Sequence, residues 1–255
     1  MISQRRLWGD VPNGFNKIQD GQTRLLVRAG LEECFSFKEF NAPAPPEEAS
    51  GHYGRAPLRA IALPDHGRGL VRRCYHGGLL RFITGTTFIS WPPRPFREVA
   101  ITVELERRGV ATVETLGAGI EVVAGPFYRG WFASREIEGA QDLWVALQSG
   151  FARAEGLENI LTAVATSLKS LHREGVCHGD LNLKNILVRR ENEGLKAYII
   201  DFDKASLFLG PVPRRIANGN LARLLRSVRK LDTERRYLSE NDWNKFIGCY
   251  YGARL

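Results

Sequence analysis

The chain has 255 residues, of which 44% are hydrophobic and 25% are charged, as in ordinary globular proteins. Its formal net charge of +8 favours an anionic partner, such as a nucleotide, a nucleic acid or an acidic membrane surface, without choosing among them. The four cysteines form no Cys-x-x-Cys pair and no apolar stretch approaches about 18 residues, which argues against zinc-ribbon, thioredoxin-like and membrane-spanning proteins and predicts a protein of the reducing cytoplasm.

The first half of the chain predicts strands and one helix. Proline and glycine mark residues 41–57 as a loop. Residues 58–63 and 70–75 have the apolar alternation of strands, and the turn between them makes a hairpin. A helix is expected over Phe96–Arg108, where Gly109 would end it.

The second half predicts mainly helices. The strongest signal lies over Leu157–Glu174, where apolar residues recur every three or four positions and make one apolar stripe. The other segments expected here are strands near 120–124, 127–136, 186–188 and 198–200, and helices over 140–147 and 217–255. Strands with one helix, followed by helices that carry a small hairpin, predict a two-lobed α+β architecture.

A constellation of polar residues follows the strongest helix. The segment His178-Gly179-Asp180-Leu181-Asn182-Leu183-Lys184-Asn185 places Asp180 and Asn185 five residues apart, and Asp201 ends the apolar run Ile199-Ile200. Phosphoryl transfer from ATP needs such a set, because Mg²⁺ must neutralise dense phosphate charge and prefers hard oxygen ligands. Asn185 and Asp201 would supply these ligands, and Asp180 would accept the proton of the attacking hydroxyl.

Each residue also has a plainer interpretation. Alone, Asp180 and Asn185 would fit turn and capping residues, and Asp201 would fit a solvated charge at the end of a strand. The histidine before them and the apolar strand after them favour the phosphoryl-transfer interpretation. Arg72 and Glu98 would, without a kinase framework, be read as surface charges.

These residues resemble the protein-kinase superfamily, and more closely the lipopolysaccharide kinase family, which includes the Kdo (3-deoxy-D-manno-octulosonic acid) kinases and the core heptose kinases. The closest likeness is to the Kdo kinases and covers about residues 50–250. The segments that carry it are Arg72–Leu80, Arg94–Glu98, His178–Leu187, Ile200–Ala205 and Asn220–Lys230. The resemblance implies a single domain with a two-lobed protein-kinase-like fold, in which a small antiparallel-sheet N-lobe with one helix (about 1–138) precedes a mainly helical C-lobe (about 139–255).

The resemblance also implies a role for each matching residue of the catalytic segment. Asp180 would be the catalytic base, and His178 would brace its loop. Asn185 and Asp201 would bind Mg²⁺ and thereby ATP. Gly179 stands where protein kinases usually have Arg, which implies that a phosphorylated activation loop does not control the enzyme.

The N-lobe residues would contact the nucleotide. Arg72 stands where kinases usually place a phosphate-binding Lys, and Glu98 would be its ion-pair partner. Gly51 and Gly54 would form the loop over the phosphates, although they make only a partial glycine motif. The planar guanidinium of Arg72 is not equivalent to a lysine ammonium, which leaves its ATP contact open.

The implied activity is transfer of a phosphoryl group from ATP to a sugar hydroxyl of the lipopolysaccharide inner core, the 4-hydroxyl of Kdo on Kdo-lipid A being the first expectation. The alternatives are a core heptose kinase, another small-molecule kinase, and a pseudokinase-like or nucleic-acid-binding module. Few aromatic residues interleave with the basic run Arg214–Lys230, so nucleic acid is not the expected partner. That run would be a solvated helix face, a cradle for the anionic acceptor, or a peripheral contact with the cytoplasmic face of the inner membrane.

Overall fold

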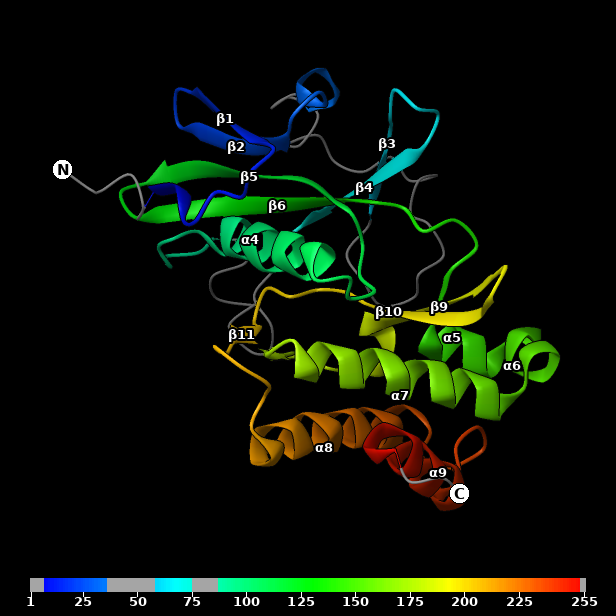
Figure 1. Cartoon of the computed structure of the whole chain (residues 1–255). Helices are drawn as coiled ribbons and strands as arrows, with labels where there is room; N and C mark the ends of the chain where they lie inside the picture. Colours follow the sequence, from blue (N-terminus) through cyan, green and yellow to red (C-terminus); the bar gives the residue numbers. More distant parts are fainter. Residues whose placement is uncertain (1–6, 36–57, 75–86, 253–255) are drawn as a thin grey trace. The chain divides into compact units, whose positions relative to one another are not determined.

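The structure is a computed structural model that describes residues 7–35, 58–74 and 87–252. The chain divides into two compact units (Figure 1). The first unit comprises Met1–Glu104 and Glu114–Glu136, and the second comprises Leu105–Val113 and Ile137–Leu255. The predicted lobe boundary near residue 138 stays a prediction.

An antiparallel sheet forms most of the first unit. Its strands lie in the order β1-β2-β5-β6-β4-β3. Their bounds are β1 Phe15–Asp20, β2 Thr23–Arg28, β3 Arg59–Ala62, β4 Arg68–Arg73, β5 Thr115–Ala124 and β6 Phe127–Arg135. The short 3₁₀ helix η1 (Glu32–Cys34) follows β2, and α4 (Arg94–Arg107) precedes β5. The predicted hairpin of β3 and β4 is confirmed, as is the predicted helix, which begins two residues earlier than expected.

The hairpin of β1 and β2 was not predicted from the sequence. Its strands are paired from Phe15↔Arg28 to Asp20↔Thr23, and Gly21 has a φ of +53° in the turn. Glycine at the first of the two loop residues, Gly21-Gln22, is typical of this kind of tight turn, because glycine tolerates positive φ. The apolar alternation along β1 is weak, because this strand lies at the edge of the sheet and is mostly exposed.

The strand β5 begins five residues before the predicted start at residue 120. Its first six residues are all buried, so the segment has no apolar alternation to reveal it. Gly117 permits the close approach of the neighbouring strand β2. A Cβ at Gly117 would lie 2.7 Å from the backbone oxygen of Leu26, which packing does not allow.

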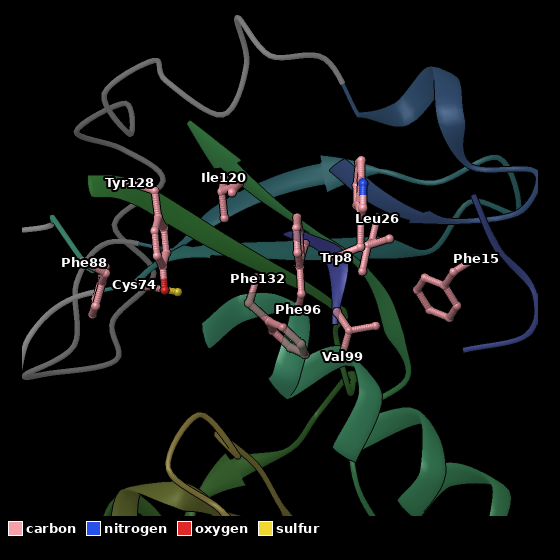
Figure 2. Close-up of a cluster of buried hydrophobic side chains, with 11 residues drawn as sticks. Trp8, Phe15, Leu26, Cys74, Phe88, Phe96, Val99, Ile120, Tyr128 and Phe132 are labelled. Atoms are coloured by element: carbon pink, nitrogen blue, oxygen red, sulfur yellow. The ribbon is translucent and has the colours of Figure 1, made fainter. Parts of the chain in front are cut away.

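The core of the first unit lies between α4 and the sheet. Figure 2 shows Phe96 and Val99 on the helix, within a cluster of buried side chains from the strands and from the segments of Trp8 and Phe88. The rings of Trp8 and Phe96 are stacked, with their centroids 5.6 Å apart. On the other face of the sheet, Leu25, Val71, Trp131 and their neighbours form a second cluster.

Helices dominate the second unit. They are α5 Leu143–Gln148, α6 Gly150–Glu155, α7 Leu157–Arg173, α8 Arg214–Leu231 and α9 Glu240–Tyr251. The short strands are β7 Gln141–Asp142, β8 Val176–Cys177, β9 Ile186–Glu191, β10 Gly194–Ile199 and β11 Ser206–Leu207, with the 3₁₀ helix η3 over Leu183–Asn185. The strands form two small antiparallel sheets, in the orders β10-β9-β7 and β11-β8. Among the described residues, no helix combines the length and the apolar character needed to cross a bilayer.

Two helix predictions differ from the structure at their ends. The helix expected from residue 140 begins at Leu143, because Gln141 and Asp142 pair with β9. The Asp142 carboxylate caps the helix by accepting the N–H of Val145 at 3.0 Å. The region expected to be helical from residue 217 contains two helices. The buried carboxylate of Asp232 holds the loop between them by accepting three backbone N–H groups.

We predict that Phe96→Ala lowers the free energy of unfolding by about 3–5 kcal/mol, since the Phe96 side chain is fully buried and its loss leaves a cavity in the cluster of Figure 2. Urea denaturation measures the change. Val123→Ala is the control, because Val123 is 42% exposed on the same sheet. An equal cost for the two variants would contradict the placement of Phe96 in the core.

Candidate active site

The catalytic segment predicted from the sequence lies between β8 and β9 of the second unit. The long helix α7 ends at Arg173, β8 follows, and residues 178–185 then run through η3 into β9. The hairpin of β9 and β10 returns the chain to Ile199, one residue before the segment Ile200–Asp203. Local folding therefore brings together two segments that are about 20 residues apart in the sequence.

The imidazole of His178 joins these two segments. Its Nε2–H donates to the carbonyl oxygen of Ile200 at 2.8 Å, and its Nδ1 accepts the backbone N–H of Asp180 at 3.1 Å. The ring is fully buried, and this burial lowers the pKa of His178. The bonds and the lowered pKa both indicate a neutral ring that carries its proton on Nε2.

The amide side chains of two asparagines hold the backbone at Asp180. The Nδ2 groups of Asn182 and Asn185 donate to the Asp180 carbonyl oxygen at 2.8 and 3.0 Å. The backbone carbonyl of Asn185 accepts the N–H of Ile200 at 3.0 Å. Asp180, Asn185 and the residue before Asp201 therefore belong to one hydrogen-bonded unit. The sequence analysis did not single out Asn182, whose Oδ1 accepts the N–H of Lys184 two residues on, a turn that asparagine favours.

Asp201 has an unusual backbone conformation. Its φ is +73°, in the left-handed region that few residues other than glycine adopt. Such a conformation costs about 1–3 kcal/mol and persists where the surroundings impose it, often at functional sites. The next residue, Phe202, is buried with its ring centroid 5.2 Å from that of His178, and it anchors the segment.

Gly179 allows the two segments to approach closely. A Cβ at this position would overlap the backbone carbonyl of Lys204. Glycine in place of the usual arginine thus has a packing reason of its own, which the sequence did not reveal. The Lys204 ammonium lies 3.3 Å from Oδ2 of Asp180, and both side chains are close to half exposed.

The donor set suits Mg²⁺ bound together with phosphates. The Nδ2 of Asn185 is committed to the Asp180 carbonyl, so Oδ1 is the amide atom that a hard cation would take. Asp201 offers a carboxylate from the adjoining segment. The described residues contain no cluster of three His, Cys, Asp or Glu side chains that could hold a metal ion. Mg²⁺ at nucleotide sites needs no such cluster, because it takes one or two protein ligands with phosphate oxygens and water.

The other predicted site residues lie in the first unit. Nη2 of Arg72, on β4, lies 2.5 Å from both carboxylate oxygens of Glu98, on α4. The Glu98 side chain is 1% exposed, and the Arg72 guanidinium also stacks over Phe132. The predicted ion pair is therefore present, while a contact between Arg72 and ATP stays a prediction. Gly51 and Gly54 lie outside the described residues.

The chain is similar to known kinases in sequence and in fold. The sequence pattern of the lipopolysaccharide kinase (Kdo/WaaP) family matches residues 64–250. The chain belongs to this family.

Individual relatives agree with this assignment. The chain is 39% identical over 158 residues to a 3-deoxy-D-manno-octulosonic acid kinase of Pasteurella multocida (strain Pm70), a match that covers 62% of this chain and 63% of that protein. It is 31% identical over 185 residues to the protein of the same name from Mannheimia succiniciproducens, with 71% and 74% of the two chains covered. The match thus spans less than two thirds of the Pasteurella protein.

A solved structure shows the fold. The protein described as WaaP in complex with acyl carrier protein superposes with a TM-score of 0.59 at 18% identity, over 91% of this chain and 90% of that chain. The predicted α+β protein-kinase-like fold is confirmed, as is the predicted family. This kinase is accordingly a phosphotransferase, as its catalytic segment indicated.

Asn220 holds the predicted catalytic segment in place, a contact that the sequence analysis missed. Its side chain, buried on α8, accepts the backbone N–H of His178 with Oδ1 at 3.2 Å and donates through Nδ2 to the His178 carbonyl at 2.5 Å. Asn220 therefore clamps both backbone groups of the residue whose ring joins the two site segments. A polar residue on the apolar stripe of α8, beside Ala217 and Leu221, was the available signal.

The clamp continues to α7 and α9 through His172. Its Nε2 lies 3.0 Å from Oδ1 of Asn220, and its Nδ1 lies 2.6 Å from the hydroxyl of Tyr250. Because Oδ1 can only accept, Nε2 carries the proton and Nδ1 accepts from the tyrosine hydroxyl. Burial lowers the pKa of His172, which agrees with this neutral form.

We predict that Asn220→Ala destabilises this kinase and lowers its turnover number, because it leaves buried backbone groups of His178 without partners, at about 1–3 kcal/mol for each group. Urea denaturation and steady-state kinetics measure the two effects. Asn218→Ala, on the exposed side of the same helix, is the control: it loses only an exposed hydrogen bond from the Tyr251 hydroxyl and is expected to change little. The clamp would be refuted by two variants of equal stability and activity.

We predict that acid destabilises the fold below about pH 6.5, the ordinary histidine pKa. His172 and His178 both have lowered pKa values, so the unfolded chain binds protons that the folded chain does not. The free energy of unfolding then falls by up to about 1.4 kcal/mol per pH unit for each histidine. Denaturation curves between about pH 8 and pH 5 test the slope. His172→Gln should remove the contribution of one histidine, and an unchanged slope would count against the assignment.

Proposed function

We propose that this kinase transfers the γ-phosphoryl group of ATP to the 4-hydroxyl of Kdo on Kdo-lipid A. The observation that carries the proposal is the hydrogen-bonded unit around His178, which holds Asp180 and Asn185 beside the segment of Asp201. The names of the Pasteurella and Mannheimia relatives support the choice of acceptor. Family membership supports ATP as the donor.

The proposed chemistry is an in-line displacement at the γ-phosphorus. The acceptor oxygen forms the new bond to phosphorus while the bond to the β–γ bridging oxygen breaks, and ADP leaves. The Asp180 carboxylate accepts the proton of the hydroxyl. Its 46% exposed side chain is open to an incoming sugar, while the clamped backbone holds it in place.

Asn185 and Asp201 would hold Mg²⁺ through Oδ1 and a carboxylate oxygen. The bound ion would neutralise charge on the β- and γ-phosphates. In the first unit, Arg72 would contact the nucleotide phosphates in place of the usual lysine, with Glu98 fixing the guanidinium. Gly51 and Gly54 would cover the phosphates. The kinase would work on the cytoplasmic face of the inner membrane, in peripheral contact with it.

A mass-shift assay with Mg-ATP tests the acceptor. Purified Kdo-lipid A is expected to gain the mass of one phosphate, and tandem mass spectrometry should locate it on the 4-hydroxyl. Heptosylated core and simple sugars are the comparison substrates. Phosphorylation of heptosylated core alone would replace the proposal with a core heptose kinase.

We predict that Asp180→Asn lowers the turnover number by about 10²- to 10⁴-fold, because an amide cannot accept the proton. ATP binding, measured by calorimetry, should remain within about threefold, since Asp180 is not among the proposed nucleotide contacts. Glu193→Gln removes an exposed carboxylate of the same unit and should leave both values unchanged. Full activity of Asp180→Asn would show that another group is the base.

A further inference from the structure

We propose that a leucine-bearing loop and the basic face of α8 together form a docking surface for an anionic lipid bilayer. The loop runs over 207–212, from the end of β11 to the residue before Pro213. The surface would bring the kinase to the lipid phase that carries its proposed acceptor, and only in that respect does the inference rest on the proposed function.

The loop exposes large apolar side chains. Leu209 is fully exposed at 112% of its reference area, and Leu207 is 51% exposed. Ile216, in the first turn of α8, is 38% exposed. Three aliphatic side chains thus face solvent within ten residues of sequence, in a unit whose other leucines are mostly buried. Exposed apolar residues that are grouped in this way mark interaction surfaces.

The leucines are held outward by a fixed backbone. Leu207 pairs with Val176 in the ribbon of β11 and β8, and the N–H of Phe208 donates to the Gly175 carbonyl at 2.8 Å. At the other end of the loop, the N–H of Val212 donates to the His172 carbonyl at 2.8 Å. A Cβ at Gly175 would lie 2.7 Å from the Phe208 carbonyl, so the loop packs closely on the chain beneath it. The exposure of Leu209 is therefore built into the fold.

The charged residues on the outward face of α8 are all basic. Four residues on it are exposed and lie within an arc of about 80° at 3.6 residues per turn. They are Arg215, Arg223, Arg226 and Lys230. The sequence of α8 contains no Asp or Glu, and its opposite face is buried. A helix of 18 residues with one charge sign on a single face attracts a surface of the other sign.

The basic face and the leucine loop are neighbours. Cys177 pairs with Ser206, the residue before the loop. Arg223 lies close to the same cysteine, since its charge opposes the rise that burial causes in the pKa of the Cys177 thiol. Figure 1 shows β11 and the start of α8 at the same end of the second unit. Arg214 is not counted in the surface, because its guanidinium stacks over Tyr251.

A bilayer fits this combination better than other anionic partners. Basic side chains beside protruding aliphatic ones are the pattern of interfacial membrane binding, in which the charges meet acidic headgroups and the leucines enter the acyl boundary. A nucleic acid would favour aromatic side chains for stacking, and the surface presents leucines instead. A folded acidic protein would need a pocket for the fully exposed Leu209, whereas the acyl boundary receives it without one.

Sedimentation with vesicles tests the surface. The purified kinase is expected to bind vesicles that contain phosphatidylglycerol and to bind pure phosphatidylcholine vesicles much more weakly. Leu209→Ser should lower the partition coefficient about tenfold, since the serine loses the apolar insertion. Arg226→Gln should lower it about fivefold and should reduce the salt dependence of binding.

Two matched controls separate the surface from general effects. Val123→Ser removes an exposed aliphatic residue of the first unit. Arg153→Gln removes an exposed positive charge on α6. Neither variant should change binding to the vesicles. Circular dichroism checks that each variant is folded. Equal binding of wild type, Leu209→Ser and Arg226→Gln would overturn the proposal. So would equal binding to neutral and anionic vesicles, or binding to an acidic protein with none to vesicles.

Activity on detergent-dispersed acceptor distinguishes the surface from the proposed function. Leu209→Ser should phosphorylate dispersed Kdo-lipid A at the wild-type rate, because Leu209 has no place in the proposed chemistry. Wild-type protein that binds anionic vesicles but phosphorylates no Kdo-lipid A would refute the acceptor and leave the surface intact. Loss of activity of Leu209→Ser on the dispersed acceptor would instead show that the loop belongs to the acceptor site, against the proposal.

Discussion

The site depends on the fully buried imidazole of His178, which makes hydrogen bonds to both segments that carry the proposed catalytic groups. Through Nδ1 it fixes the backbone of Asp180, and through Nε2 it fixes the carbonyl of Ile200, one residue before Asp201. Both bonds require a neutral ring with one particular tautomer, which the lowered pKa of the buried histidine maintains. One ring therefore holds the backbone of both segments that carry the side chains of Asp180, Asn185 and Asp201.

The helices α7, α8 and α9 hold His178 in place through a series of hydrogen bonds. Asn220 on α8 holds the backbone of His178, and His172 on α7 connects Asn220 to Tyr250 on α9. In this series of hydrogen bonds each side chain is the partner of the next, so that no donor group of the series lacks an acceptor. The α8 helix thus has two functions: its buried side positions the catalytic loop, and its exposed basic side forms part of the proposed membrane surface.

The first unit contributes a different kind of constraint. The buried carboxylate of Glu98 would be costly without a cation, and Arg72 supplies one from the neighbouring strand β4. The cluster that packs α4 against the sheet fixes the position of Glu98, because Phe96 and Val99 lie within one turn of it. Packing therefore determines where the guanidinium of Arg72 lies, and this supports its proposed contact with phosphates.

The sequence by itself predicted the helix α7 from its apolar periodicity and the catalytic groups Asp180, Asn185 and Asp201 from their spacing, while its resemblance to the lipopolysaccharide kinases predicted the family and the kinase-like fold. Only the tertiary structure revealed the hairpin of β1 and β2, the fully buried start of β5, the overlap that requires Gly179 and the clamp of Asn220. The hairpin escaped prediction because its exposed edge strand has little apolar alternation, and the other features arise from contacts between segments far apart in the chain, which leave no periodic pattern in the sequence. The exposed loop of Leu207 and Leu209 belongs to the same group, since composition cannot distinguish an exposed leucine from a buried one.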